Sequence, residues 1–245
     1  LNNDGFPELV VGANGDDTYG TNAGCAYTIY LQNLSSLDTV IKISEASNEL
    51  ASHLTTNDNF GYGICNVGDL NGDGNPDLVA GISQLDGSGT NEGGLAVILL
   101  DSLGDLDSVF TISETHRVFS GLLDNSDELG RVVTAESDQD GDGLKEVLVV
   151  SMFDDDYATD RGAVYELFLA ENPDTTVYTP DSALYEIPNE GMEFDDPDKY
   201  SSLNVLNGYL TDNDQLSVVV EIGDVDGNGI TDLAAGAPNG SNGGR

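Results

Sequence analysis

The sequence predicts an all-β protein made of repeated units, each with four short antiparallel strands. Three observations support this prediction. A nine-residue loop rich in carboxylates, amides and glycine occurs three times in full, short apolar runs bounded by glycine and aspartate follow each loop, and no stretch has a sustained helical period. We expect about three and a half such units in the 245 residues.

The loops set the repeat length. The full copies begin at positions 69, 138 and 224, and the first eight residues are the same loop without its first member. The steps between full copies are therefore 69 and 86 residues, which indicates a supersecondary unit with an insertion in the third copy, near 171–209. The four copies are Asp69–Asp77, Asp138–Glu146, Asp224–Asp232 and Leu1–Glu8.

Each unit is expected to run through a strand before the loop, a strand directly after it, and two more strands. Short, β-branched runs of this kind are typical of strands. We expect three, four, four and two strands in the four units, and the runs given next place all of them except the fourth strand of the third unit. The first strands are Phe60–Ile64, Leu129–Val133 and Leu216–Val220; the second are Leu9–Val11, Leu78–Ala80, Val147–Val150 and Leu233–Ala235; the third are Ala26–Tyr30, Leu95–Leu99 and Ala163–Leu167; the fourth are Val40–Ile43 and Val109–Ile112.

The loop composition predicts a calcium site. A large, hard cation needs oxygen ligands, which the loop supplies from side chains at positions 1, 3, 5 and 9 and from the backbone carbonyl at position 7, with a glycine at position 6 for the turn. No loop contains His or Cys, which favours Ca²⁺ over zinc or copper. The candidate ligands are Asp69, Asn71, Asp73, Asn75 and Asp77; Asp138, Asp140, Asp142, Leu144 and Glu146; Asp224, Asp226, Asn228, Ile230 and Asp232; and, in the truncated loop, Asn2, Asp4, Phe6 and Glu8.

Metal-free interpretations fit the loop less well. Asp-Gly and Asn-Gly pairs are ordinary hairpin turns, but a turn alone does not require carboxylates at both position 1 and position 9. An EF-hand needs a glutamate at position 12, where these loops have Ala80, Val149 and Ala235 inside expected strands. A generic acidic loop would not keep the same register three times.

The units resemble the FG-GAP repeats of the integrin α-subunit β-propeller and its bacterial and archaeal relatives. Phe60-Gly61 matches the first signature, Ala235-Gly236-Ala237-Pro238 matches the second, and the acidic loop lies between the two elements. Departures occur at Leu129, at Gln215-Leu216 and at Ser151, which we align with the Phe, the Phe-Gly and the GAP glycine of the family.

The resemblance implies antiparallel propeller blades that belong to a larger propeller or assembly, since propellers usually close with about four to eight blades. The blades are expected at about 1–56, 57–125, 126–210 and 211–245, the first and last incomplete. It also implies that the loops joining second and third strands lie opposite the calcium loops, on the ligand-facing side. These loops are Asp16–Asn22, Gln84–Glu92, Asp154–Asp160 and Asn239–Gly243.

The charge restricts the partners. The formal net charge is −38, with 45 Asp and Glu against 7 Lys and Arg. Such a surface repels nucleic acid and anionic lipid, and the longest apolar stretch, Leu95–Leu100, is far too short to cross a bilayer. We expect no nucleic-acid partner and no membrane insertion, and a location outside the cell or at its surface.

The two cysteines, Cys25 and Cys65, are either small buried hydrophobic residues or a disulfide.

No nucleophile elbow, phosphate-binding loop or zinc-protease motif occurs, so we expect no enzyme activity. The acidic cluster Asp154-Asp155-Asp156 is expected to be a solvated loop.

Three functional hypotheses follow. The first is a calcium-stabilised extracellular propeller module for adhesion or protein interaction, with a protein or glycan ligand at the cell surface. The second is a structural subunit of a surface layer or filament, in which copies of the chain pair with one another. The third is a non-catalytic propeller attached to a hydrolase, which the resemblance to FG-GAP-bearing phospholipases allows.

Overall fold

The fold is described from a computed structural model of the chain. It describes residues 6–33, 36–44, 50–115, 119, 122–138, 143–155, 159–169, 185–186, 213–227 and 231–239.

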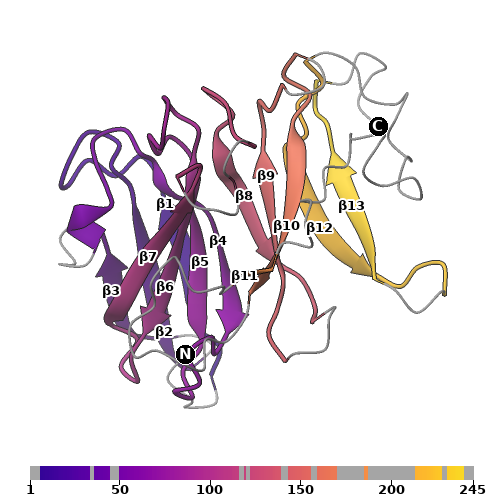
Figure 1. The fold of residues 1–245 in the computed structure, drawn as a ribbon. Helices are drawn as coiled ribbons and strands as arrows, with labels where there is room; N and C mark the ends of the chain where they lie inside the picture. The colour runs from indigo at the N-terminus through magenta and orange to yellow at the C-terminus, as the bar shows by residue number, and fades with distance from the viewer. Residues whose placement is uncertain are drawn as a thin grey trace.

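The described residues form four small antiparallel sheets that follow one another along the chain (Figure 1). We call these sheets blades 1 to 4. Their strands number three, four, four and two, as the sequence predicts. Blade 1 holds β1 (Leu9–Ala13), β2 (Cys25–Asn33) and β3 (Ser36–Ile43); blade 2 holds β4 (Phe60–Gly68), β5 (Asp77–Ile82), β6 (Gly94–Leu100) and β7 (Leu106–Ser113); blade 3 holds β8 (Leu129–Ala135), β9 (Val147–Ser151), β10 (Ala163–Leu169) and β11 (Tyr185–Glu186); blade 4 holds β12 (Val218–Gly223) and β13 (Asp232–Gly236).

The strands pair in sequence order within each blade, and the blades pack face to face. Strands β1 and β2 contact β4, strands β4, β5 and β6 contact β8, and strands β8 and β9 contact β12. Figure 1 shows the resulting row of sheets, with β1 to β3 at one end and β12 and β13 at the other. Only a short 3₁₀ turn, η1 (Leu50–Ser52), interrupts the all-β pattern in the described residues. The all-β class and its propeller-type blades are therefore confirmed.

The position of a strand in the row explains its sequence. Strands β5, β6 and β9 are buried along their whole length because a blade covers each face, and they read as continuous apolar runs. Strand β12 instead alternates: Val219 is buried toward blade 3, whereas Val218 and Val220 are about half exposed on the other face.

Glycines allow the first three blades to approach closely. A Cβ placed on Gly12 would lie 1.8 Å from the carbonyl oxygen of Gly61, and a Cβ on Gly81 would lie 1.8 Å from that of Gly130. Both facing glycines also have left-handed φ angles, +84° at Gly61 and +96° at Gly130, which other residues rarely adopt. The two signature glycines of the repeat therefore meet one another across the blade interface.

The structure corrects our alignment of two departures. Val150 pairs with Val164 as Gly81 pairs with Leu95, so Val150, not Ser151, takes the place of the GAP glycine in blade 3. The sequence alone favours Ser151, because serine is small like glycine. The strand register shows that its neighbour Val150 occupies the position.

The second correction concerns the start of blade 4. The Leu216 amide donates to the Arg161 carbonyl as the Phe60 amide donates to the Ala23 carbonyl. Leu216-Ser217, not Gln215-Leu216, therefore occupies the Phe-Gly position, because blade 4 has one residue fewer between this point and its loop. Both glycines of the close contact are thus replaced at the interface between blades 3 and 4.

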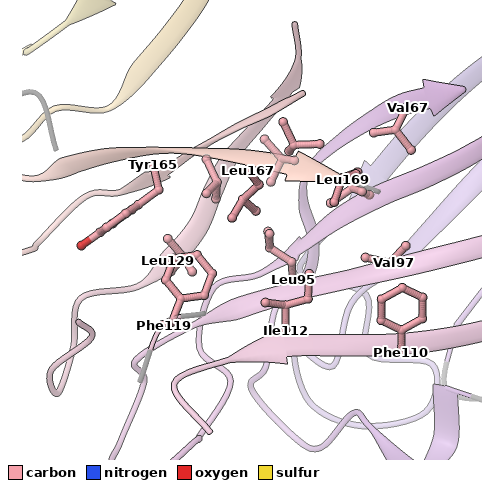
Figure 2. Packing of buried hydrophobic residues seen from close by; sticks show 14 of the residues in the cluster. Val67, Leu95, Val97, Phe110, Ile112, Phe119, Leu129, Tyr165, Leu167 and Leu169 are labelled. Carbon is pink, nitrogen blue, oxygen red and sulfur yellow. The ribbon is translucent and has the colours of Figure 1, made fainter. Parts of the chain in front are cut away.

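The largest apolar cluster lies between blades 2 and 3. Its members are fully or nearly fully buried, and Phe119 meets Tyr165 edge to face with ring centroids 5.4 Å apart. In Figure 2, Tyr165, Leu167 and Leu169 lie along one strand, β10, with Leu95, Val97, Ile112 and Phe110 below it and Val67 beside Leu169.

The remaining differences from the sequence prediction are local. Strand β3 begins four residues earlier than expected, because Ser36 already pairs with Asn33 of β2 and the two strands stay paired as far as Ile43. Strand β11 comes from the expected insertion and supplies the fourth strand of blade 3; the rest of 171–209 lies outside the described residues. None of the described helical segments is long and apolar enough to span a membrane.

Candidate metal centre

In blades 2, 3 and 4 the acidic loop lies between the first two strands, and in blades 2 and 3 the glycine at position 6 is among the described residues. In blade 2 this residue is Gly74, with a φ of +90°, and in blade 3 it is Gly143, with a φ of +95°. Nothing lies within 4 Å of a Cβ built on either glycine. The requirement for glycine is therefore conformational, as the sequence predicts, and does not arise from crowding.

The loop of blade 2 is described in full, and its carboxylates hold its backbone. Asp69 accepts hydrogen bonds from the Asp73 amide at 3.0 Å and from the Gly74 amide at 2.7 Å. Asp73 accepts one from the Asn75 amide at 2.7 Å, and the Asn71 side chain bridges to Asp73 at 3.1 Å. The side chains at positions 1, 3 and 5, of which Asp69 and Asn71 are half-buried and Asp73 is exposed, thus converge on one short turn.

Position 9 anchors the loop to the blade. Asp77 is fully buried and accepts the Leu70 amide at 2.8 Å and the Leu100 amide at 3.0 Å. Burial raises the pKa of Asp77 to about 7, although these two hydrogen bonds oppose the shift and the charges of Asp73 and Asp69 add to it. A nearby cation would favour the ionised form of this carboxyl.

The loop of blade 4 brings three carboxylates together. Oxygen atoms of Asp224, Asp226 and Asp232 lie within 4.8 Å of one another, so this group could hold a metal ion. Asp232 also accepts the Val225 amide at 2.7 Å, which repeats the contact of Asp77 with Leu70. Asn228 and Ile230 lie outside the described residues.

The other two loops are described in part. Asp138 accepts the Gly143 amide at 2.9 Å, the counterpart of the Asp69 contact with Gly74, and Glu146 is buried at position 9. Leu144 packs against the cluster between blades 2 and 3. In the first loop Phe6 is exposed and Glu8 is half-buried. Asp140, Asp142, Asn2 and Asp4 lie outside the described residues.

Two segments of the chain match a protein-family model. The FG-GAP repeat model matches residues 60–99 and 219–245, which carry strands β4 to β6 and nearly all of β12 and β13. The chain carries FG-GAP repeats. Blades 1 and 3 lie outside the matched segments but repeat the strand order and the hydrogen bonds of the FG-GAP blades. A comparison with curated proteins found no match.

The donors of the FG-GAP loops fit a hard cation. Every side-chain donor is a carboxylate or an amide oxygen, and Asp224, Asp226 and Asp232 already lie at distances that one ion could bridge. If the ion is bound, it neutralises carboxylates that otherwise repel one another across the turn. The remaining loop residues hold the backbone in the shape that presents these oxygens.

Sequence reasoning missed a row of buried aspartates on the side opposite the loops. Each of these aspartates is no more than 3 % exposed and stands two residues before the residue that corresponds to Phe60 at the start of a blade. They are Asp58, Asp127 and Asp214. Burial raises the pKa of Asp127 to about 7, against its hydrogen bond from the Asp124 amide, with Asp154 adding to the shift. The sequence does carry a pattern that could have identified them. In each of these three units the aspartate follows Asn or Ser and stands two residues before the residue that corresponds to Phe60.

One expected surface group is buried. Asp154 is 3 % exposed and accepts the Tyr165 hydroxyl at 2.8 Å, so the prediction of a solvated acidic loop is wrong at this position. Asp155 is exposed as expected, and Asp156 lies outside the described residues. Cys25 and Cys65 are free thiols, which supports the interpretation of two small hydrophobic residues.

Two further carboxyls were missed at the loop end of blade 3. Burial raises the pKa of Glu136 to about 8, and the charges of neighbouring glutamates add to the shift. Burial and the charge of Glu146 raise the pKa of Glu166 to about 7. Neither residue belongs to the loop motif, so the motif gave no reason to single them out.

Proposed function

We propose that the chain is a calcium-stabilised β-propeller module that acts outside the cell in adhesion or protein interaction and has no catalytic activity of its own. The observation that carries the proposal is the oxygen-only group Asp224, Asp226 and Asp232, which lies within a segment matched by the FG-GAP model.

The role of calcium in this proposal is to stabilise each hairpin. For a loop of the weaker extracellular class, with a dissociation constant on the order of 0.1 mM, 1 mM Ca²⁺ stabilises the fold by about 1.4 kcal/mol per site. Three loops of this kind would raise the melting temperature by on the order of 10 °C. Such weak sites need a calcium-rich medium, which supports a location outside the cell.

Calorimetry and ion counting test this role. We expect the melting temperature to fall when a chelator replaces 1 mM Ca²⁺, and Asp69→Ala to bind one ion fewer than the wild type. Asp107→Ala, an exposed carboxylate on strand β7, is the matched control and should bind as many ions as the wild type. Equal melting temperatures with calcium and with chelator would refute the proposal.

The proposed ligand surface consists of the loops between the second and third strands, and the loops of blades 1, 2 and 3 are each hydrogen-bonded to the next blade. The Asn57 amide donates to the Thr21 carbonyl at 2.8 Å, and the Ser126 amide donates to the Thr90 carbonyl at 2.9 Å. The same contact joins the Asn213 amide to Thr159 at 2.7 Å. Loops fixed in this way on a rigid scaffold are preorganised for recognition, which lowers the entropic cost of binding.

The exposed charges on these loops favour a basic protein partner. Asp17, Asp86 and Asp155 occupy the same place in three successive blades, and all three are exposed. Acidic groups arranged in this way steer a positively charged partner and repel an anionic one.

A binding screen against extracellular proteins and glycans tests the interaction, with the wild type and two variants immobilised in parallel. We expect Asp17→Lys combined with Asp86→Lys to weaken binding of a partner at least tenfold and to remove its salt dependence. Asp107→Lys changes charge on a strand and should leave binding unchanged. A partner that binds both charge variants equally well would exclude this surface.

The exposed faces at the ends of the row favour a second candidate, self-association. Val218, Val220 and Ile222 on β12, and Leu9 and Val11 on β1, are each 44 % to 53 % exposed. Apolar surface of this kind can bury itself against another copy. Sedimentation at increasing protein concentration distinguishes the two, because filaments or oligomers would form without any added partner.

A further inference from the structure

Four glutamates gather where the loop end of blade 3 faces blade 4. The Glu136 amide donates to the Glu146 carbonyl at 2.8 Å, which extends the pairing of β8 with β9, and Glu166 on β10 pairs with Leu148 on β9. Strand alternation places all three glutamate side chains on the face that carries Leu148 and Val164 toward blade 4. Glu221 on β12 lies on the same face of that strand as Val219, which packs back against blade 3.

These carboxylates are withdrawn from water. Glu136 is 5 % exposed, Glu146 2 % and Glu166 7 %, and the Glu136 Oε2 atom is buried without a hydrogen-bond partner. An ionised carboxylate that is buried without a partner is costly, so such groups normally have a counter-charge.

No ion pair found among the described residues supplies that counter-charge to Glu136 or Glu166. The ion pairs found among the described residues join Lys42 to Asp16 and Arg131 to Glu128, and neither lies at this cluster. With 7 basic against 45 acidic residues, the chain has few cations to offer. Within the part of the chain that the structure describes, the remaining sources of positive charge are a proton and an ion from the medium.

Packing does not require carboxylates at these positions. One repeat earlier, Val67 stands where Glu136 stands and Val97 stands where Glu166 stands, and both valines are fully buried in the cluster between blades 2 and 3. Two blades of this repeat can therefore pack against each other with valines at these two positions. At the interface between blades 3 and 4, Glu136 and Glu166 thus put two carboxylates where the preceding interface has two apolar side chains.

We propose that Glu136, Glu166 and Glu221 form a second class of cation site, which takes a hard divalent ion such as Ca²⁺ between blades 3 and 4. The ligands come from β10, β12 and the residue after β8, so the ion joins two blades, whereas each FG-GAP loop holds its ion within one blade. Ser137 positions Glu221 by donating its amide and its hydroxyl to the carboxylate, each at 2.9 Å.

The glutamate oxygens lie farther apart than those of the blade 4 loop. Among the described residues only Asp224, Asp226 and Asp232 bring three carboxylate oxygens within 4.8 Å of one another, so the glutamates of the interblade site must close around the ion. Four acidic side chains without a counterion repel one another, and an ion reverses that force. Water molecules complete the six to eight oxygen ligands that Ca²⁺ takes.

Ion counting on the full chain tests this site. The double variant E136V/E166V copies blade 2 and should bind one Ca²⁺ fewer per chain than the wild type, measured by equilibrium dialysis and by native mass spectrometry. The isosteric variant E136Q/E166Q, which keeps the volume of both side chains, should lose the same ion. In chelator, E136V/E166V should melt at a higher temperature than the wild type, because it removes buried carboxylates that have no counterion.

The outcomes separate this site from the loops. An unchanged ion count in both double variants overturns the interblade site and leaves shared protons as the neutralising charge. Asp69→Ala removes a loop ion only, so it should lower the count in the wild type and in E136V/E166V alike. If Asp69→Ala has no effect while E136V/E166V loses an ion, the loop proposal fails and the interblade site stands.

Discussion

The interface between blades 2 and 3 and the interface between blades 3 and 4 are built from the same repeat in two different ways. Between blades 2 and 3 the two signature glycines meet, and a large apolar cluster extends from Leu95 to the loop end at Val67. Between blades 3 and 4 Val150 and Ser217 stand in the glycine positions, the apolar cluster is smaller, and glutamates occupy the loop end.

The difference shows that the repeat specifies how strands pair within a blade more strictly than how neighbouring blades pack. Both glycines of the contact change together, because a side chain on either one would strike the backbone of the other at the close spacing. At the interface where both glycines are replaced, carboxylates also occupy the loop end. One interface is then held by apolar packing, and the other depends on the charge that neutralises Glu136 and its neighbours.

The largest effect is expected from removing an apolar side chain at the tighter interface. Leu95→Ala should lower the free energy of unfolding by about 4 kcal/mol, because the surrounding side chains are fully buried and relax little around the cavity. Leu216→Ala at the other interface should lower it by about 2 kcal/mol, since fewer neighbours surround the gap. Urea unfolding in excess calcium measures both, and equal losses would contradict the comparison.

Adding one methyl group at the glycine contact should have the next largest effect. Gly81→Ala places a Cβ against the Gly130 carbonyl and should destabilise the fold by about 3 kcal/mol, because backbone must move to admit it.

Gly236→Ala is the matched control in blade 4. Its Cβ would meet only the side chain of Val218, which is about half exposed and can rotate, so the loss should be below about 1 kcal/mol. If thermal unfolding shows the two alanine variants to be equally stable, the glycine contact does not set the blade spacing.

The smallest effect concerns pH and the turn that begins blade 3. Because burial raises the pKa of Asp127 to about 7, the folded protein binds its proton more tightly than the unfolded chain, whose pKa is about 4. This contribution to stability is therefore complete below about pH 4 and is lost as the pH rises toward 7.

Asp127→Asn keeps an oxygen for the Asp124 amide but has no proton to lose. The variant should show a flatter decline in unfolding free energy between about pH 4 and pH 7 than the wild type. Asp107→Asn, on an exposed strand position, should follow the wild-type curve. Parallel curves for the wild type and Asp127→Asn would show that Asp127 titrates as an ordinary carboxyl.

The sequence by itself determined the repeat, the strand order and the loop chemistry. These are local properties: alternating or continuous apolar runs define the strands, and the glycine at position 6 of the loops in blades 2 and 3 is required by a φ angle that its own turn imposes. The candidate ligands of blade 2 could be named because all of them lie within the nine residues Asp69–Asp77.

Only the tertiary structure decided what happens between blades. The meeting of Gly81 with Gly130, the place of Val150 in that contact, and the gathering of Glu136, Glu166 and Glu221 join residues from separate strands. No period or motif links such residues, because their proximity depends on how two sheets stack. Burial follows from the same stacking, which is why carboxyls that look like ordinary surface charges in the sequence are withdrawn from water in the fold.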